Sequence, residues 1–181
     1  MLQQQKKGAF RSMNDTNRKA IFSWAMYDWA NSAFATTVMA GFFPVFFNSY
    51  WSAGADTVVS TARLGLANSL AGIAVALLAP LLGAIADRGS ARKRFLVFFA
   101  FMGSLMTASL WMVARGDWKA AILVFVLASI GFSGSIVFNV ALLVSVAGAK
   151  QRERVSALGY GLGYLGGGIL FALNVSKTLR P

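Results

Sequence analysis

The chain has 181 residues, of which 57% are hydrophobic and only 13% are charged, and its formal net charge is +11. A soluble domain is typically about 45–50% apolar and about 25% charged, so this composition excludes a disordered chain and most water-soluble folds. The chain contains no cysteine and no histidine, which excludes disulfides, thiolate or imidazole metal sites and histidine-based catalysis. We therefore expect neither a metal nor a cofactor.

Five long apolar stretches account for this composition. They cover residues 21–47, 64–86, 95–114, 120–147 and 155–175. Each is close to or longer than the roughly 20 residues that a helix needs to cross a hydrocarbon core. Because the stretches are continuous and lipid cannot satisfy open backbone groups, they predict helices. The predicted fold class is an all-α integral membrane bundle with five spans, preceded by a cytoplasmic segment at 1–20 and followed by a short tail at 176–181.

The basic residues alternate between the two sides of this predicted bundle. Only Arg63, Arg115 and Lys119 lie in the loops on one side. Twelve lie on the other, namely Lys6, Lys7, Arg11, Arg18, Lys19, Arg88, Arg92, Lys93, Arg94, Lys150, Arg152 and Arg154. This bias predicts a cytoplasmic N-terminus, although Lys177 and Arg180 after the fifth span run against it. The charges do not form one basic face, so we expect the lipid bilayer and not a nucleic acid as a partner.

Asp28 is the one acidic residue inside a predicted span. A carboxylate at the centre of a bilayer costs at least roughly 2.5–3.5 kcal/mol, so it should face protein or a water-filled cavity. Asn31 lies three residues further and shares its helix face, and Asn139 holds a comparable polar position in the fourth span. These three residues are candidates for a substrate or proton pathway. The alternatives are a shallow or structural carboxylate, and helix–helix hydrogen bonding by Asn139.

Aromatic residues mark both ends of the first span. Trp24, Tyr27 and Trp29 lie near one end, and Tyr50 and Trp51 lie near the other. Because aromatic rings favour the membrane–water interface, we expect these residues to form two aromatic belts.

A loop motif connects the second and third spans, with the sequence Gly83-Ala-Ile-Ala-Asp87-Arg88-Gly-Ser-Ala-Arg92. It resembles the signature G-x-L-A-D-R-x-G-R-K of the major facilitator superfamily, which occupies the same place between spans two and three. Ser90 and Ala91 replace a glycine and a basic residue of that signature. The resemblance implies a conformational switch, in which the Asp pairs with the loop Arg and caps a helix of the opposite half. The alternative is ordinary loop charge with one incidental acid. The matching residues are Gly83, Asp87, Arg88 and Arg92.

Small residues dominate one face of the fifth span. Gly159, Gly163 and Gly167 lie four residues apart, a spacing that lets another helix approach closely, so we expect this face to pack against a helix. The same run resembles the antiporter signature G-x-x-x-G-P-x-x-G-G of facilitator transporters, with Tyr164 in the place of the proline.

Further stretches narrow the resemblance. They are Tyr27-Asp-Trp-Ala-Asn-Ser-Ala-Phe34, Phe43-Pro44, Phe138-Asn-Val-Ala-Leu-Leu143 and Arg154-Val-Ser156. From about residue 21 to residue 175 the chain is similar to unknown major facilitator family 1, which includes the vacuolar effluxers related to autophagy. The resemblance implies a secondary transporter that moves a small solute by alternating access, with amino-acid export in some members. H⁺ is the candidate coupling ion, and a bacterial inner membrane is the expected location.

The number of spans conflicts with that resemblance. Such transporters bind substrate between two bundles, each built from 3+3 inverted repeats, whereas five spans complete less than one bundle. We therefore expect an N-terminal part of a longer transporter, inactive alone and completed by a C-terminal half or a second copy. The alternative is a small non-transporting membrane protein that docks partner helices through its Gly-rich fifth helix. No enzyme is expected, because the spans contain no paired carboxylates, nucleotide loop or nucleophile with a base.

Overall fold

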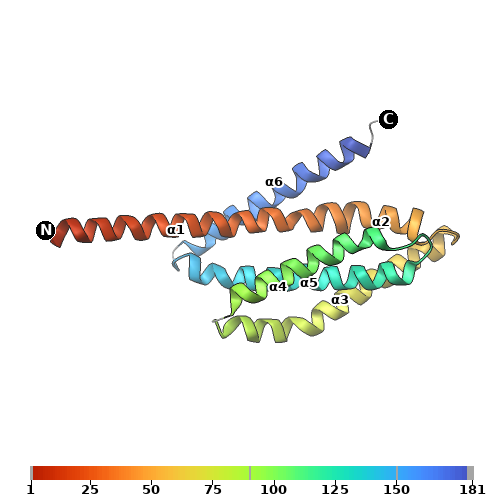
Figure 1. The fold of residues 1–181 in the computed structure, drawn as a ribbon, viewed down its shortest axis with the longest axis horizontal. Coiled ribbons are helices and arrows are strands. Elements are labelled where there is room, and N and C mark those ends of the chain that lie inside the picture. The colour runs from red at the N-terminus through yellow and green to blue at the C-terminus, as the bar shows by residue number, and fades with distance from the viewer. Residues whose placement is uncertain (1, 90, 150, 179–181) are drawn as a thin grey trace.

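A computed structural model describes the backbone of residues 2–89, 91–149 and 151–178, and the side chains of residues 18–89, 91–149 and 151–177. Within these ranges the chain forms helices and no strand. The first helical stretch comprises α1 (Leu2–Ala33), the π-helical η1 (Phe34–Phe42), α2 (Phe43–Phe46) and the π-helical η2 (Phe47–Trp51). It is followed by α3 (Thr57–Asp87), α4 (Arg92–Ser109), the 3₁₀ turn η3 (Leu110–Met112), α5 (Trp118–Val146) and α6 (Arg152–Thr178), as Figure 1 shows.

Five of these stretches are long and apolar enough to cross a membrane. They are Arg18–Trp51, Thr57–Asp87, Arg92–Met112, Trp118–Val146 and Arg152–Lys177. Each overlaps one of the apolar stretches in the sequence. The predicted fold class, an all-α membrane protein with five spans, is therefore confirmed.

Aspartate caps set the beginnings of two of the spans. The Asp56 side chain accepts a hydrogen bond of 2.8 Å from the main-chain N–H of Val59, and α3 therefore begins at Thr57, ahead of its apolar stretch. The Asp117 side chain accepts in the same way from Ala120 at 3.1 Å, at the start of α5. Such caps satisfy N–H groups that the first helical turn leaves without partners.

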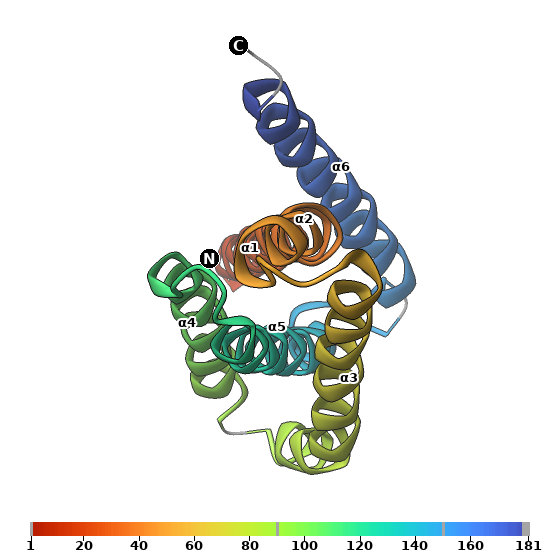
Figure 2. The same ribbon diagram turned by 90° about the vertical axis from the view of Figure 1, so that its right-hand side faces the viewer.

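The helices form two layers. In one layer α1 packs against α6, and in the other α5 lies between α3 and α4. The layers meet where α1 packs on α5, and the end-on view of Figure 2 shows α1 and α6 above α4, α5 and α3. The side view of Figure 1 shows α6 crossing the long first helix obliquely. Helices α1 and α5 thus occupy the middle of the bundle.

A close helix crossing joins α4 and α5 through two glycines. A Cβ on Gly131 would lie 2.6 Å from the Cα of Gly103 and 2.9 Å from the main-chain oxygen of Phe99. Because nothing but backbone lies there, no side chain could move aside. Small residues let helix backbones approach closely in a membrane, and this crossing uses that effect.

Two of the five aromatic side chains predicted to form belts are buried, so that prediction is wrong for Trp24 and Trp51, whereas Trp29 and Tyr50 are exposed. Trp24 is only 7% exposed, and its Nε1–H donates to the main-chain oxygen of Asn139 at 2.7 Å. Trp51 is also buried, and its Nε1–H donates to the main-chain oxygen of Val113 at 3.4 Å. A buried indole finds a hydrogen-bond partner in this way. Trp111, in contrast, is 94% exposed.

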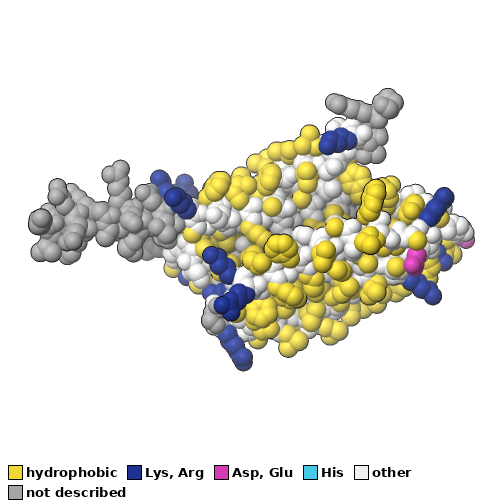
Figure 3. Space-filling view, in the orientation of Figure 1, with side chains coloured by type: hydrophobic (Ala, Val, Ile, Leu, Met, Phe, Trp, Pro, Cys, Tyr) yellow, Lys and Arg dark blue, Asp and Glu magenta, His cyan; other side chains and the backbone are white. Residues whose placement is uncertain are grey.

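The surface divides into a hydrophobic middle and two charged ends. Figure 3 shows yellow side chains along the bundle and blue Lys and Arg side chains gathered at its two ends. We call the end where α3 meets α4 and where α6 begins the basic end, because Arg88, Arg92, Lys93, Arg94, Arg152 and Arg154 lie there. The side chains of Lys6, Lys7, Arg11, Ser90, Lys150 and Arg180, named in the sequence predictions, lie outside the described residues.

Candidate functional site

Two cavities flank the first helix, one on each side of its contact with α5. The cavity between α1, α5 and α6 has a volume of about 360 Å³ and includes Asp28, and we call it the Asp28 cavity. The cavity between α1, η1, α4 and α5 has a volume of about 500 Å³ and includes Tyr27, and we call it the Tyr27 cavity. Adjacent residues of one helix thus face different spaces.

The Asp28 cavity brings together two of the three predicted pathway residues. Asp28 and Asn139 both line it, from α1 and α5 respectively. The hydrogen bond from Trp24 to the main-chain oxygen of Asn139 joins the two helices one turn before Asp28. Among the described residues that line the cavity, Asp28 carries the only full charge. The arrangement is a lone carboxylate beside a buried amide.

Main-chain groups satisfy the hydroxyl groups next to Asp28. Ser32 Oγ donates to the main-chain oxygen of Asp28 at 2.9 Å. Thr36 Oγ1 lies 3.1 Å from the main-chain oxygen of Ser32 and 3.2 Å from that of Gly167 on α6. These contacts lie where α1 changes into the π-helical η1, a form of helix that is frequent at functional sites. They leave the Asp28 carboxylate without a hydrogen bond from any described residue.

The three predicted packing glycines lie against α1 of the same chain. A Cβ on Gly163 would lie 2.7 Å from Ser32 Oγ and 3.1 Å from Asp28 Oδ2. A Cβ on Gly167 would lie 2.9 Å from Thr36, and one on Gly159 would lie 2.5 Å from the ring of Trp24. The alternative in which this face docks partner helices is therefore wrong, because α1 already occupies it.

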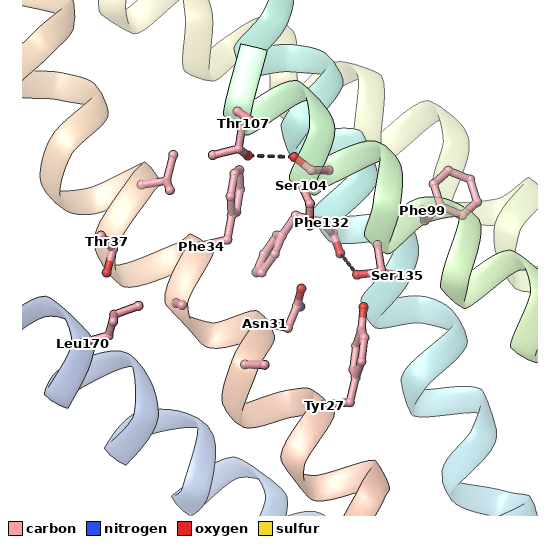
Figure 4. A pocket seen from close by; sticks show the side chains of 16 residues that line it. Tyr27, Asn31, Phe34, Thr37, Phe99, Ser104, Thr107, Phe132, Ser135 and Leu170 are labelled. Atoms are coloured by element: carbon pink, nitrogen blue, oxygen red, sulfur yellow. Dashed lines mark hydrogen bonds between the residues drawn. The ribbon is translucent and has the colours of Figure 1, made fainter. Parts of the chain in front are cut away.

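Asn31 lines the Tyr27 cavity and not the Asp28 cavity. A separation of three residues turns a helix through about 300°, which leaves the two side chains about 60° apart. That offset is enough to place them on different sides of the contact between α1 and α5, so the predicted shared face is wrong. Figure 4 shows Asn31 pointing into its cavity between Tyr27 and Phe34.

The Tyr27 cavity is mostly apolar, with a few polar side chains and no charged one among the described residues that line it. The Tyr27 hydroxyl is buried and points toward Ser135 without completing a hydrogen bond (Figure 4). Ser135 Oγ itself donates to the main-chain oxygen of Phe132 at 2.7 Å. The hydroxyl of Thr37 is also buried and has no hydrogen-bond partner among the described residues. This space has room for water or for the side chains of a further element.

The loop motif is organised around Arg92. Helix α3 ends at Asp87, and Arg92 is the first residue of α4. Its Nε–H donates to the main-chain oxygen of Ala86 at 2.6 Å, and its Nη1 donates to Ser145 Oγ on α5 at 3.2 Å. Arg92 therefore ties together α3, α4 and α5, and no ion pair joins it to Asp87 within the described residues. The ion pair between Asp and the loop Arg that the resemblance implies is replaced by a contact with the main chain.

The other motif residues face outward. Asp87 and Arg88 are exposed, and a Cβ on Gly83 would meet nothing within 4 Å. Gly89 has a φ of +80°, which turns the chain from α3 toward α4. Ser90 lies outside the described residues.

Sequence reasoning missed Tyr160 and Tyr164 of α6, which also line the Asp28 cavity. Their ring centroids lie 5.4 Å apart, and the side chains are 66% and 70% exposed. Their spacing of four residues placed them on one helix face, but nothing in the sequence indicated that this face adjoins Asp28.

The chain is similar to a family of membrane transporters and to two bacterial proteins. The family model described as vacuole effluxer Atg22 like matches residues 16–147. The uncharacterized MFS-type transporter YxiO of Bacillus subtilis (strain 168) is 39% identical over 158 residues, which cover 87% of this chain and 37% of that protein. An uncharacterized protein of Aquifex aeolicus (strain VF5) is 29% identical over 166 residues, covering 91% of this chain and 41% of that protein. The chain thus spans less than half the length of these relatives, and no solved structure matches it.

Proposed function

The chain belongs to the Atg22-like family of vacuole effluxers, and from this membership we propose that it acts in a secondary transporter that moves a small polar solute by alternating access. The resemblance found in the sequence is confirmed by the family match, and the relative from Bacillus supports a transport role over an enzymatic one. The observation that carries the proposal is the Asp28 cavity, where three spans meet around one carboxylate.

The position of this cavity suits a solute pathway. Asp28 lies ten residues into the span that begins at Arg18, about 15 Å along the helix axis. A carboxylate at that depth requires water, a proton or a cation beside it. We propose that a proton moving down its gradient neutralises Asp28 in one state of the cycle. The uncharged carboxyl group then allows the helices around it to close.

The transported solute is proposed to be small, with amino acids as the first candidates. Ligand cavities span roughly 300–1,000 Å³, and the part of the cavity that this chain forms, about 360 Å³, already has room for a molecule of that size. The opposite wall of the pathway is proposed to come from the remainder of a longer transporter or from a second copy.

We propose that the basic end faces the cytoplasm of a bacterial cell and that the bundle lies in the inner membrane. The exposed Asp87 and Arg88 would then lie at the cytoplasmic surface as part of the conformational switch. A carboxylate at the N-terminus of a helix is stabilised by about 0.3–1 kcal/mol, so Asp87 could lock one state by capping a helix of the opposite half.

Flux measurements with purified full-length protein in liposomes test the proposal. Wild-type protein is expected to exchange labelled amino acids across the membrane under a proton gradient. Asp28→Asn is expected to lower this flux by at least about tenfold, because a charge-assisted contact is worth roughly 1.5–3 kcal/mol. Glu153→Gln, which alters an exposed acid at the start of α6, is the matched control and should keep the flux. Equal flux in both variants would refute the proposed role of Asp28.

A further inference from the structure

We infer that the Asp28 cavity recognises a positively charged amine, and that the ammonium group of the solute and a proton bind in turn to the same carboxylate. This inference rests on the proposed transport function and adds to it the chemical class of the solute. Three properties of the cavity carry it: its charge, its aromatic wall and its free hydrogen-bond acceptors.

The negative charge of the cavity favours a cation as its ligand. Asp28 is the one charged side chain among the described residues that line it, and no Lys or Arg in that set lies opposite. The titratable groups that face Asp28 from α6 are the phenols of Tyr160 and Tyr164, while α5 contributes the neutral Asn139. On α1 itself the adjacent Tyr27 faces the other cavity. A half-buried carboxylate with no positive partner among the described residues favours a proton or an external cation as its counter-charge.

The wall of the cavity favours an organic cation. Trp24, Tyr160 and Tyr164 line it, and the two tyrosine side chains are largely exposed. The faces of aromatic rings attract ammonium groups, with Trp as the strongest partner. A hard inorganic cation instead requires a shell of oxygen ligands, and a single carboxylate with one amide does not supply it.

The hydrogen-bond acceptors fit a primary ammonium group, which has three N–H donors. The carboxylate of Asp28 receives no hydrogen bond from the described residues, and neither does the side-chain amide of Asn139, which is only 3% exposed. A proton alone would need only the carboxylate, whereas an ammonium group can also donate to the amide oxygen of Asn139.

Glycine provides the room for this contact. A Cβ on Gly163 would lie 3.1 Å from Asp28 Oδ2, so any larger residue would press on the carboxylate. The free volume of about 360 Å³ accommodates a small amine with a short side chain.

The exchange step balances in atoms and charge. The ammonium group enters while Asp28 is protonated, the carboxyl group releases its proton to water, and the carboxylate that remains pairs with the cation. No covalent bond forms other than that between the released proton and water. Because the two cations compete for one carboxylate, each transport cycle exchanges an amine for a proton.

Binding measurements without any flux test this inference. The probe is butylammonium chloride, added to the purified full-length protein in nanodiscs at constant ionic strength, with the thermal unfolding midpoint as the readout. A ligand that binds only the folded state raises this midpoint. We expect butylammonium to raise it, whereas sodium chloride and the uncharged 1-butanol leave it unchanged. In acidic solution the apparent affinity should fall by up to about tenfold per pH unit, because one proton competes with one cation.

Variants separate the carboxylate and the aromatic wall. Asp28→Asn should weaken the apparent affinity by at least about tenfold, and Glu153→Gln should not change it. If Asp28→Asn does not fold, Tyr160→Leu and Tyr160→Phe provide the test, since only the leucine variant loses the aromatic face and only it should bind more weakly.

An equal response to sodium chloride would overturn the inference in favour of an inorganic cation site, and an unchanged response in Asp28→Asn or in both Tyr160 variants would also overturn it. Amine binding without solute flux would refute the proposed function and leave this inference standing. Solute flux without amine binding would refute this inference and leave the proposed function standing.

Discussion

Gly163→Ala is expected to impair transport while changing stability little. The new Cβ would lie 2.7 Å from Ser32 Oγ and 3.1 Å from Asp28 Oδ2, so both polar groups must move by a few tenths of an ångström or more. Rotation of Ser32 breaks its 2.9 Å hydrogen bond to the main-chain oxygen of Asp28, which costs about 1 kcal/mol. Replacing glycine by alanine inside a helix stabilises that helix by about 0.8–1.0 kcal/mol. We therefore expect the free energy of unfolding to change by less than about 1 kcal/mol.

The functional effect should be larger, because the displaced group is the carboxylate itself. Small displacements of a positioned group can lower rates by up to about 10²-fold. Solute flux in liposomes and unfolding in mixed micelles are the two measurements. Gly168→Ala is the matched control, since a Cβ there would meet nothing within 4 Å, and it should transport normally. Normal flux in Gly163→Ala would refute the idea that the close contact of α6 with α1 positions Asp28.

Three further predictions concern the framework of the bundle. Gly131→Ala should lower the free energy of unfolding by about 1–3 kcal/mol, because its Cβ meets the backbone of α4, and unfolding in mixed micelles measures the loss. Asp56→Ala should lower the free energy of unfolding by about 1 kcal/mol, because it removes the cap of α3. An unchanged free energy of unfolding in the same assay would refute a role of this cap. Trp24→Phe should lower the free energy of unfolding by about 1 kcal/mol, because the hydrogen bond to Asn139 is lost. Trp111→Phe, at an exposed position, is the control and should leave the free energy of unfolding unchanged.

The helices could be predicted from the sequence because length and hydropathy alone decide whether a segment can span a bilayer. Their ends could not be predicted as well. The caps at Asp56 and Asp117 extend α3 and α5 beyond their apolar stretches. The sequence does not distinguish an aspartate that caps a helix from any other aspartate in a loop.

The partners of side chains were the least predictable feature. The glycine spacing in α6 indicated a smooth face, but it gave no information about which helix covers that face. The contact of Gly103 with Gly131 left no pattern, because Gly103 is the only glycine of α4, and Gly131 and Gly134 of α5 are three rather than four residues apart. Trp24 resembles an interfacial anchor in the sequence, but in the structure it turns inward and donates to the main-chain oxygen of Asn139 on α5.

The predicted pathway residues also show that the sequence does not reveal which side chains share a cavity. Asp28 and Asn139 were identified as polar residues in apolar spans, and the structure places both at one cavity. Asn31 satisfied the same criterion but faces the other cavity, since an offset of about 60° matters when two cavities adjoin one helix. Tyr160 and Tyr164 carried no signal, because aromatic residues are common in membrane helices.

Alkylation of a single introduced cysteine tests most directly whether the Asp28 cavity carries solute. The chain contains no cysteine, so Ser156→Cys places the only thiol of these 181 residues at the cavity, and Glu153→Cys places one on the exposed first turn of the same helix, outside the cavity. A water-soluble maleimide should label both variants, and butylammonium should slow the labelling of Ser156→Cys without affecting that of Glu153→Cys. Labelling of Ser156→Cys that the amine leaves unchanged, or slows no more than that of Glu153→Cys, would contradict the assignment of this cavity to the solute.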